Sequence, residues 1–500
     1  QASCIALDPQ MNLWAGSDDG TIGIYHPAKK NIDHVRIVGP EVAPDLRSIS
    51  KIYAMNANEL MIGCFKQGLK TYNIKTGQVQ SLSLTPNKYA SIYVRDIIRG
   101  SGQQYWVATE SGIYIYDMGS GKTEHLRKRA GDSYAIADNA VYTFCRDNQG
   151  GMWVGTYFGG LNYYSKENSK FKKYYPLPGV NSISGDAVRE IVPDAKGHLW
   201  IGTEDAGINQ FDPATGRFTH YTATGKPGDI SYPNIHGLLA WGNQLLVGPF
   251  FHGLEIMDQS TGKVTRRFAQ VKDSSNTTSD FVSSIYLTKD STLLIGTAYH
   301  GPSLFTFDPR QNKFKRVTQI PFNVYTFDIK EDSRGNIWTG SVSEGAFFYN
   351  PKTGKQGNIR FGRKVKDKMV DEFAVYNIME DSDHFIWFAT NGGGLIRLSK
   401  DHRSFKRFTV KQGLLSNVVF SILEDDEKRL WVSSLKGLIC LDKRTEQVRV
   451  YTRSNGLITD QFNYNSAYRA VDGTMYFGSV KGMISFNPAQ LGQKYVSPPT

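Results

Sequence analysis

Short stretches that alternate between apolar and polar residues run along the whole chain, separated by turn residues. Residues 187–194 (AVREIVPD) and 198–203 (HLWIGT) each alternate in this way, and residues 207–212 and 217–223 repeat the pattern. Alternation with a period of two predicts β-strands, and the Gly, Asp and Pro residues between the stretches predict tight turns. The pattern therefore predicts a unit of four short antiparallel strands.

This unit recurs about every 46 residues along the chain. A tryptophan in the second strand marks the strong copies, and another apolar residue marks the weaker ones. The positions are Trp14, Trp106, Trp153, Trp200, Trp338, Trp387 and Trp431, with Met61, Leu246, Leu294 and Tyr476. Four-stranded units at this spacing are typical of propeller blades. We predict an all-β fold of tandem β-propellers with about eleven four-stranded antiparallel blades, in which the tryptophan packs between adjacent blades.

This number of blades exceeds what one ring normally holds, so we expect two rings. The simplest division places four blades of an N-terminally incomplete first propeller in residues 1–183 and a second, seven-bladed propeller in residues 184–491. The opposite order, seven blades and then four, fits the same spacing. Residues 492–500 have the composition of an exit linker. The last unit lacks an obvious fourth strand, and we expect a strand from elsewhere to close its ring.

Composition and charge exclude some classes of protein. The 500 residues are 40% hydrophobic and 21% charged, and they contain no apolar run long enough to span a membrane. The chain opens inside a repeat without a signal-peptide pattern, and we interpret its N-terminus as a cut edge. The net charge of +11 is spread along the chain, so we expect no nucleic-acid partner. The four cysteines lack the spacing of metal ligands, and we predict no metal site.

The repeat also carries a family pattern. The order LWIGT-x-D-x-G-(I/L)-N-x-(F/Y)-D-P-x-T-G-x-F-x-x-Y resembles the two-component regulator propeller repeat, and so do residues 413–434 and 455–479. The resemblance covers essentially the whole chain. It implies the periplasmic sensor of a Bacteroidetes-type hybrid two-component system, whose parent has two seven-bladed propellers, a small β-sandwich, a membrane anchor, a histidine kinase and a DNA-binding output. About three blades, the sandwich, the kinase and the output are missing from this sequence.

Candidate ligand-binding residues lie where the copies of the repeat differ. The turn between the second and third strands usually contains Asp and Gly, but three copies present aromatic residues there instead. These turns hold Tyr157 and Phe158, then Phe250, Phe251 and His252, then Tyr299 and His300. Exposed rings favour contact with a partner, and flat rings suit the C–H face of a sugar. The alternative is that they pack against an adjacent propeller or a dimer mate.

Charged and amide residues extend this candidate site. Lys436 and Lys481 occupy the same turn in other copies, and Arg189 and His236 lie near the starts of inner strands. They could bind sulfates or uronate carboxylates through charge-assisted hydrogen bonds, although each lysine alone is typical of a solvated surface. At matching turns, Glu344 and Asn391 could bind hydroxyl groups.

We therefore favour a non-catalytic sensor in which an oligosaccharide, acidic ones included, biases the arrangement of a homodimer. The resemblance implies that the signal passes to the histidine kinase and a transcriptional output. A polysaccharide lyase or glycosidase is the first alternative, but the spacing assembles neither an arginine with an acid–base pair nor two facing carboxylates. A protein-interaction scaffold is the second. We assign no catalytic residue and no cofactor.

Overall fold

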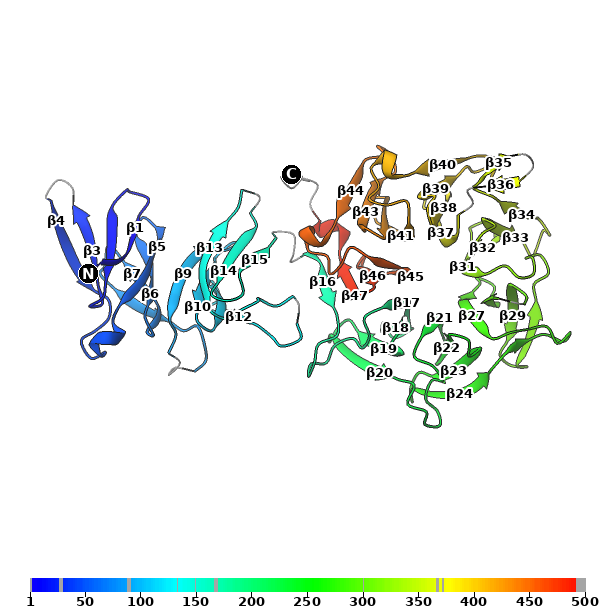
Figure 1. Cartoon of the computed structure of the whole chain (residues 1–500), viewed down its shortest axis with the longest axis horizontal. Helices are drawn as coiled ribbons and strands as arrows, with labels where there is room; N and C mark the ends of the chain where they lie inside the picture. The colour runs from blue at the N-terminus through cyan, green and yellow to red at the C-terminus, as the bar shows by residue number, and fades with distance from the viewer. Residues whose placement is uncertain are drawn as a thin grey trace. The chain divides into compact units, whose positions relative to one another are not determined.

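The computed structural model describes residues 2–26, 30–87, 91–132, 134–148, 150–165, 170–299, 301–365, 368–370 and 373–491. The chain divides into two compact units, Gln1–Lys166 and Glu167–Thr500. Strands dominate both units (Figure 1), which confirms the all-β prediction. The described helical elements are short 3₁₀ turns, η1 (Pro44–Leu46), η3 (Val410–Gln412), η4 (Arg453–Asn455) and η5 (Pro488–Gln490). Within the described ranges, no helix has the length and apolarity needed to cross a bilayer.

The first unit contains four antiparallel sheets, each built from consecutive strands. In chain order they are β1 (Ala2–Leu7), β2 (Leu13–Ser17), β3 (Thr21–His26) and β4 (Asn31–Arg36); β5 (Ile49–Asn56), β6 (Glu59–Cys64), β7 (Gly68–Asn73) and β8 (Val79–Leu82); β9 (Val94–Arg99), β10 (Gln104–Thr109), β11 (Gly112–Asp117) and β12 (Thr123–Leu126); and β13 (Val141–Arg146), β14 (Met152–Thr156) and β15 (Leu161–Tyr164). The last of these sheets has three described strands.

Among its described residues, the second unit contains seven four-stranded sheets. Six use consecutive strands: β17 (Val188–Pro193), β18 (Leu199–Thr203), β19 (Ile208–Asp212) and β20 (Arg217–Tyr221); β21 (Ile235–Trp241), β22 (Gln244–Pro249), β23 (Leu254–Asp258) and β24 (Lys263–Phe268); β27 (Phe281–Leu287), β28 (Leu293–Ala298), β29 (Leu304–Asp308) and β30 (Lys313–Arg316); β31 (Thr326–Glu331), β32 (Ile337–Ser341), β33 (Ala346–Tyr349) and β34 (Gln356–Ile359); β37 (Val375–Glu380), β38 (Ile386–Thr390), β39 (Leu395–Leu398) and β40 (Phe405–Phe408); β41 (Val419–Glu424), β42 (Arg429–Ser434), β43 (Gly437–Asp442) and β44 (Val448–Tyr451). Two hairpins, β25 (Val271–Lys272) with β26 (Thr278–Ser279) and β35 (Arg363–Val365) with β36 (Lys368–Val370), leave the ring between blades.

The seventh sheet closes the ring with strands from both ends of the second unit. It consists of β45 (Phe462–Arg469), β46 (Met475–Ser479), β47 (Gly482–Phe486) and β16 (Lys172–Tyr174). Lys172 pairs with Ser485 and Tyr174 pairs with Met483, so β16 is the outermost strand beside β47 (Figure 1). A strand from elsewhere in the chain thus completes the last blade, as the sequence indicated.

This closure corrects the predicted boundary between the two rings. The prediction ended the first propeller at residue 183, but the compact units divide after Lys166. Residues 172–174 belong to the second ring because they form the outer strand of its last blade. Sequence periodicity places a short strand with the repeat that it adjoins along the chain, whereas this strand pairs with residues more than 300 positions later. The predicted linker, residues 492–500, lies outside the described residues.

A buried Asp–Trp pair organises many of the blades. In five of them the tryptophan indole N–H donates to a carboxylate six residues earlier: Trp14 to Asp8, Trp200 to Asp194, Trp338 to Asp332, Trp387 to Asp381 and Trp431 to Asp425, at 2.8–3.2 Å. The same aspartates close the preceding turn, as in Asp194, whose Oδ1 accepts from Lys196 N at 2.8 Å. Each Asp therefore fixes a turn and satisfies a buried indole at once.

The tryptophans pack between blades, with one exception. Trp338 contacts Phe388 of the next blade with ring centroids 5.8 Å apart, and Trp431 contacts Phe486 of the next at 4.8 Å. The ring's tryptophans and the apolar residues that replace them in weak copies are buried. Trp153 is 40% exposed and corrects the prediction at that position. It lies in the last sheet of the first unit, where the described residues supply no following blade in that unit.

Candidate ligand-binding site

Every inner strand of both units carries a β-bulge near its start. Val188 pairs with Thr203 and Glu190 with Gly202, which leaves Arg189 as an extra residue outside the ladder. The corresponding extra residues are Ser3, Ser50, Arg95 and Tyr142 in the first unit, and His236, Ser283, Phe327, Tyr376 and the Phe420–Ser421 pair in the second. Bulges redirect a side chain out of the sheet pattern and occur often beside functional sites. We call this the bulge position.

The bulge position holds two chemical kinds of residue. Ser3, Ser50 and Ser283 donate their hydroxyls to the first inner-strand carbonyl of the next blade, as Ser283 does to Thr326 O at 2.6 Å. These serines connect blades. Apart from Ser421, the other bulge residues are aromatic, histidine or arginine, and most of them contact one another. In the second unit, residues of the second kind contribute to the candidate site.

Aromatic rings form a continuous wall around one end of the axis of the second unit. His236 contacts Phe281 at 4.9 Å between centroids, and the contacts run on through Tyr299, Tyr325 and Phe327 at 4.4–5.8 Å. From Phe327 they continue to Tyr464, Tyr376 and Phe420 at 5.1–5.7 Å. We call the wall formed by His236, Phe281, Tyr299, Tyr325, Phe327, Tyr376, Phe420 and Tyr464, together with Arg189, the axial cup.

The axial cup opens into a pocket of about 600 Å³. Its lining combines rings with hydrogen-bonding groups: Tyr299, Asn323, Val324, Tyr325, Phe327, Val342, Ser343, Glu344 and Tyr464. A concave surface that pairs aromatic faces with a few polar groups suits a sugar, whose C–H face stacks while its hydroxyls find partners. The volume lies in the range typical of small-ligand sites.

Strand β45 contributes to this pocket through an irregular segment. Phe462 pairs with Ser479 and Ala467 with Phe477, so the intervening residues of β45 form an unusually large bulge. Asn465 adopts a left-handed backbone conformation, with φ of 52°, and donates from Nδ2 to Phe327 O at 2.5 Å. Tyr464 precedes it and lines the pocket. The last blade thus supplies one wall of the site.

Arg189 is fully buried against this wall. Its guanidinium carbon lies 3.5 Å from the centroid of the Tyr464 ring, and its Nη1 donates to Tyr464 O at 2.8 Å. Glu190 Oε1 lies 3.5 Å from Nη1, and Glu204 Oε1 lies 3.8 Å from Nε. The stacking on Tyr464 is a cation–π contact in a desolvated setting.

Burial shifts the titration of two further groups near Arg189. Burial, with the nearby Arg189 charge, lowers the pKa of His236 to about 3, so this imidazole is neutral at pH 7. Burial raises the pKa of Glu190 to about 8, against the opposing effect of Arg189. Glu190 is therefore mostly protonated at neutral pH, and the carboxylate of Glu204 also faces the guanidinium.

The structure brings six of the predicted site residues to this part of the ring. Arg189, His236, Tyr299 and Glu344 belong to the cup or its pocket. Phe250 packs on His236 at 5.1 Å, and Phe251 stacks on Tyr299 at 5.9 Å between centroids. Phe251 and Tyr299 are 43% and 52% exposed, and both have φ near 55°. Bulky residues rarely adopt this left-handed conformation, which often marks a functional segment.

The remaining predictions for the second unit are dispersed. His252 is exposed, stacks on Tyr232 and has Nδ1 within 2.7 Å of Phe250 O. Asn391, Lys436 and Lys481 are exposed on the turns of three later blades. Lys481 Nζ lies 3.7 Å from Asp186 Oδ2. His300 lies outside the described residues.

Tyr157 and Phe158 belong to the first unit and form a separate surface. Phe158 is 87% exposed, and Tyr157 stacks on Tyr142 with centroids 5.4 Å apart. Arg95 lies between the rings of Tyr142 and Tyr93, at 4.0 and 4.2 Å. This aromatic stack is a second candidate contact surface, on the first unit.

Sequence analysis missed most of the rings in the wall. Phe327, Tyr376 and Phe420 occupy the same bulge position as Arg189 and His236, directly after the first residue of each inner strand. Aligning the repeats on the tryptophan of the second strand does not bring the residues of the bulge position into register. Alignment on the inner strands would have revealed it, because residue type there varies sharply between otherwise similar blades.

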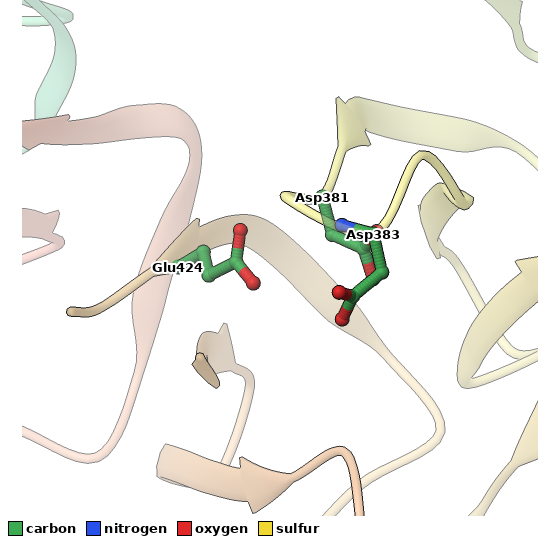
Figure 2. Close-up of side chains that lie close together, drawn as sticks. All are labelled: Asp381, Asp383 and Glu424. Atoms are coloured by element: carbon green, nitrogen blue, oxygen red, sulfur yellow. The ribbon is translucent and has the colours of Figure 1, made fainter. Parts of the chain in front are cut away.

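A group of three carboxylates has the spacing of a cation site but already has a cationic partner. Asp381, Asp383 and Glu424 offer oxygens within 4.8 Å of one another (Figure 2). Lys443 Nζ lies 3.0 Å from Asp381 and 2.9 Å from Asp383, and it also contacts Glu424. Hydrogen bonds from Lys428 and Lys443 lower the pKa of Asp383 to about 2. The group is an ion-pair network that connects adjacent blades.

Fold and repeat together define a tandem β-propeller protein, and comparison with known proteins agrees. Residues 135–158, 182–205 and 413–436 match the two component regulator propeller family, so the chain carries these repeats. The extracellular domain of the hybrid two-component system BT3049 from B. thetaiotaomicron superposes with a TM-score of 0.67 at 21% identity, over 98% of this chain and 68% of that one. The corresponding domain of BT4673 gives 0.53 at 17% identity, over 97% and 64%.

A curated relative extends beyond this chain. Histidine kinase P4 of Formosa agariphila is 25% identical over 49% of this chain and 25% of its own length. The chain therefore matches about a quarter of that relative.

Proposed function

We propose that this chain is the ligand-binding part of an extracytoplasmic sensor, which binds an oligosaccharide and relays its presence to a histidine kinase and a transcriptional output. The two-component regulator propeller repeats and the similarity to a histidine kinase support the signalling role. The fold shared with extracellular domains of hybrid two-component systems supports a periplasmic location. In this proposal a membrane anchor and the kinase belong to the parent protein.

The axial cup carries the proposal of a sugar ligand. Its wall presents aromatic faces from most of the blades, and its pocket adds the side chains of Asn323, Ser343 and Glu344. Exposed rings on left-handed turns, at Phe251 and Tyr299, gain little for folding from their position and offer stacking platforms. This combination favours a glycan over a purely apolar ligand.

A homodimer would convert binding into a signal. A ligand shifts an equilibrium only through its different affinities for the two states. Strand β16 enters the ring beside β47, and β45 of the same blade supplies Tyr464 to the pocket. A sugar that moves Tyr464 would act on the blade that joins both ends of the second unit. In this proposal the ligand contacts a segment suited to relay its presence.

A calorimetric screen tests the proposal. The whole chain would be titrated with neutral and acidic oligosaccharides of plant, fungal and animal origin, and Phe251→Ala and Tyr299→Ala would be tested with any ligand found. We expect saturable binding that weakens about tenfold or more in each variant, because stacking of the sugar face on an aromatic ring is lost. Thermal unfolding should change little, since both rings are exposed.

Phe405→Ala is the matched control, because Phe405 is a similarly exposed ring on the outer strand β40. It should leave binding unchanged. Release of unsaturated products or new reducing ends would instead favour a lyase or glycosidase. No binding to any oligosaccharide would contradict the proposal and leave a protein-interaction scaffold. A large loss of stability in the Phe251 or Tyr299 variant would assign those rings to a packed interface.

A further inference from the structure

Arg189 keeps three of its five N–H donors, those on Nε and Nη2, unused inside the axial cup. Its side chain is 0% exposed, yet Nε and Nη2 have no hydrogen-bond partner among the residues that the structure describes. The Nδ1 atom of His236, on the adjacent inner strand, is buried without a partner as well. Buried donors and acceptors are almost always paired, and an orphan at a candidate site calls for a bound group.

The two unused nitrogens lie on one edge of the guanidinium. Nε–H and the neighbouring N–H of Nη2 point in the same direction and match the spacing of two oxygens in a carboxylate or a sulfate. Nη1 is already engaged by Tyr464 O, which fixes the orientation of the fork. A neutral hydroxyl would satisfy at most one of the two donors, whereas an anionic group satisfies both.

The charged groups around the Arg189 guanidinium allow a further anion to bind there. Glu190 faces Nη1, and its burial raises its pKa to about 8, so it adds little negative charge at neutral pH. Glu204 Oε1 lies 3.8 Å from Nε, beyond hydrogen-bond distance, and accepts from Asn463 Nδ2 at 3.1 Å. The Glu204 carboxylate is thus engaged by another donor and leaves the Nε–H of Arg189 without a hydrogen bond.

We propose that the axial cup binds an acidic sugar residue, whose carboxylate or sulfate occupies the Nε–Nη2 fork of Arg189 while its ring packs among Tyr464, Tyr325 and Tyr299. This inference rests on the proposed function and specifies its ligand class. Because the Tyr464 ring covers the guanidinium, the anionic group reaches the fork when that ring moves aside. The unpartnered Nδ1 of His236 is available to a hydroxyl of the same sugar.

Matched ligands and matched variants test this inference. The probes are oligogalacturonides and the disaccharides of chondroitin sulfate and heparin, each beside its carboxyl-reduced or desulfated form. Calorimetry should show that the wild type binds at least one acidic probe at least about tenfold more tightly than its neutral form, as expected for a charge-assisted bidentate pair. Added salt should weaken that binding.

Three variants distinguish the contribution of the planar guanidinium fork of Arg189 from that of its positive charge. Arg189→Met should lose the preference for the acidic form. Arg189→Lys, which keeps the charge but lacks the planar fork, should lose much of it. Arg217→Met removes the same charge from the exposed outer strand β20 and should bind like the wild type. Thermal unfolding of each variant shows whether the ring remains folded.

The outcomes separate the two proposals. Equal binding of acidic and neutral forms by the wild type, or an unchanged preference in a folded Arg189→Met or Arg189→Lys variant, overturns the acidic-ligand inference and leaves the oligosaccharide sensor intact. Lack of binding to the acidic panel, with binding to neutral glycans, overturns it too. Absence of binding to every oligosaccharide contradicts both proposals.

Discussion

Trp106 and Trp153 hold the same place in neighbouring sheets of the first unit, yet their surroundings differ. Trp106 is 7% exposed and packs edge-on against Phe144 and Tyr164 of the following sheet. Trp153, in the last sheet of that unit, is 40% exposed. In the closed ring of the second unit, by contrast, the tryptophan of every strong repeat is buried.

The contrast shows that the repeat determines where a tryptophan stands in the sequence, whereas the adjacent sheet determines whether that tryptophan is buried. In the closed ring, β16 completes the last blade, and each sheet lies between two others. In the first unit, the two end sheets leave apolar residues in solvent, with Leu7 on one and Leu161 on the other. Stability in such arrays is the sum of what each unit contributes and what each interface between units contributes. Substitutions at equivalent positions should therefore have different effects.

The largest expected difference is between the two tryptophans themselves. Trp106→Ala should lower the free energy of unfolding of the first unit by about 3–5 kcal/mol, because a buried ring is replaced by a cavity. Trp153→Ala should lower it by about 1 kcal/mol or less, because much of that ring already faces water. Urea unfolding of the whole chain, followed by circular dichroism, measures both. Equal losses would mean that a partner buries Trp153 in solution.

A smaller difference is expected between two lysines that connect blades. Lys443 is buried among three carboxylates, whereas Lys51 is 36% exposed with its Nζ 2.8 Å from Asp96 Oδ1. Lys443→Met should cost about 3 kcal/mol, because it removes the one lysine that contacts all three carboxylates. Lys51→Met should cost about 1 kcal/mol or less. Thermal and urea unfolding of both variants test this order.

Calcium gives an independent readout of the same group. Once Lys443 is removed, Asp381, Asp383 and Glu424 present oxygens at a spacing that a hard cation can bridge. Calcium should therefore raise the melting temperature of Lys443→Met and leave the wild type unchanged. Lys428→Met removes another lysine that contacts Asp383 but keeps Lys443, and it should remain insensitive to calcium. A calcium response in the wild type would contradict the role of Lys443 as the resident cation.

Much of the fold was readable from the sequence because its cues are local. The alternation of residues 187–194, the Asx turn at Asp194 and the recurrence of Trp200 each lie within one repeat. The pairing of β16 with β47 joins residues at opposite ends of a ring, and only ring closure explains it. The exposure of Trp153 likewise depends on a neighbour and not on its own sequence.

Only part of the site could be predicted from the sequence, because some of its contacts join residues that are far apart along the chain. Exposed rings at Phe251 and Tyr299 broke a local turn pattern, so they were found. Tyr464 was missed because it lies in an irregular bulge of β45, whose length no other blade shares. Its contact with Arg189 joins the first and last blades of the ring. That contact exists only in the folded, closed ring.

The smallest predicted effect is on the pH dependence of stability, and it arises at the position two residues after the start of the inner strand. Lys51 holds this position in the first unit, opposite Gly63, and Glu190 holds it in the ring, opposite Gly202. The Glu190 side chain is only 13% exposed, and burial raises its pKa from 4.5 to about 8. Between these values the folded ring binds a proton that the unfolded chain has lost. Stability from Glu190 is therefore complete below pH 4.5 and is lost as pH rises through about 8.

Glu190→Gln should flatten this dependence. His236, whose pKa is lowered from 6.5 to about 3, loses stability in the opposite direction, as pH falls below 6.5. The informative window is therefore about pH 6.5–8, where the Glu190 contribution approaches about 1.4 kcal/mol per pH unit. Urea unfolding across it should show a shallower decline in Glu190→Gln than in the wild type. Glu427→Gln, at an exposed carboxylate, should keep the wild-type slope. An unchanged slope in Glu190→Gln would mean that the closed axis admits enough water to hold Glu190 ionised, and would remove the contrast with the open position of Lys51.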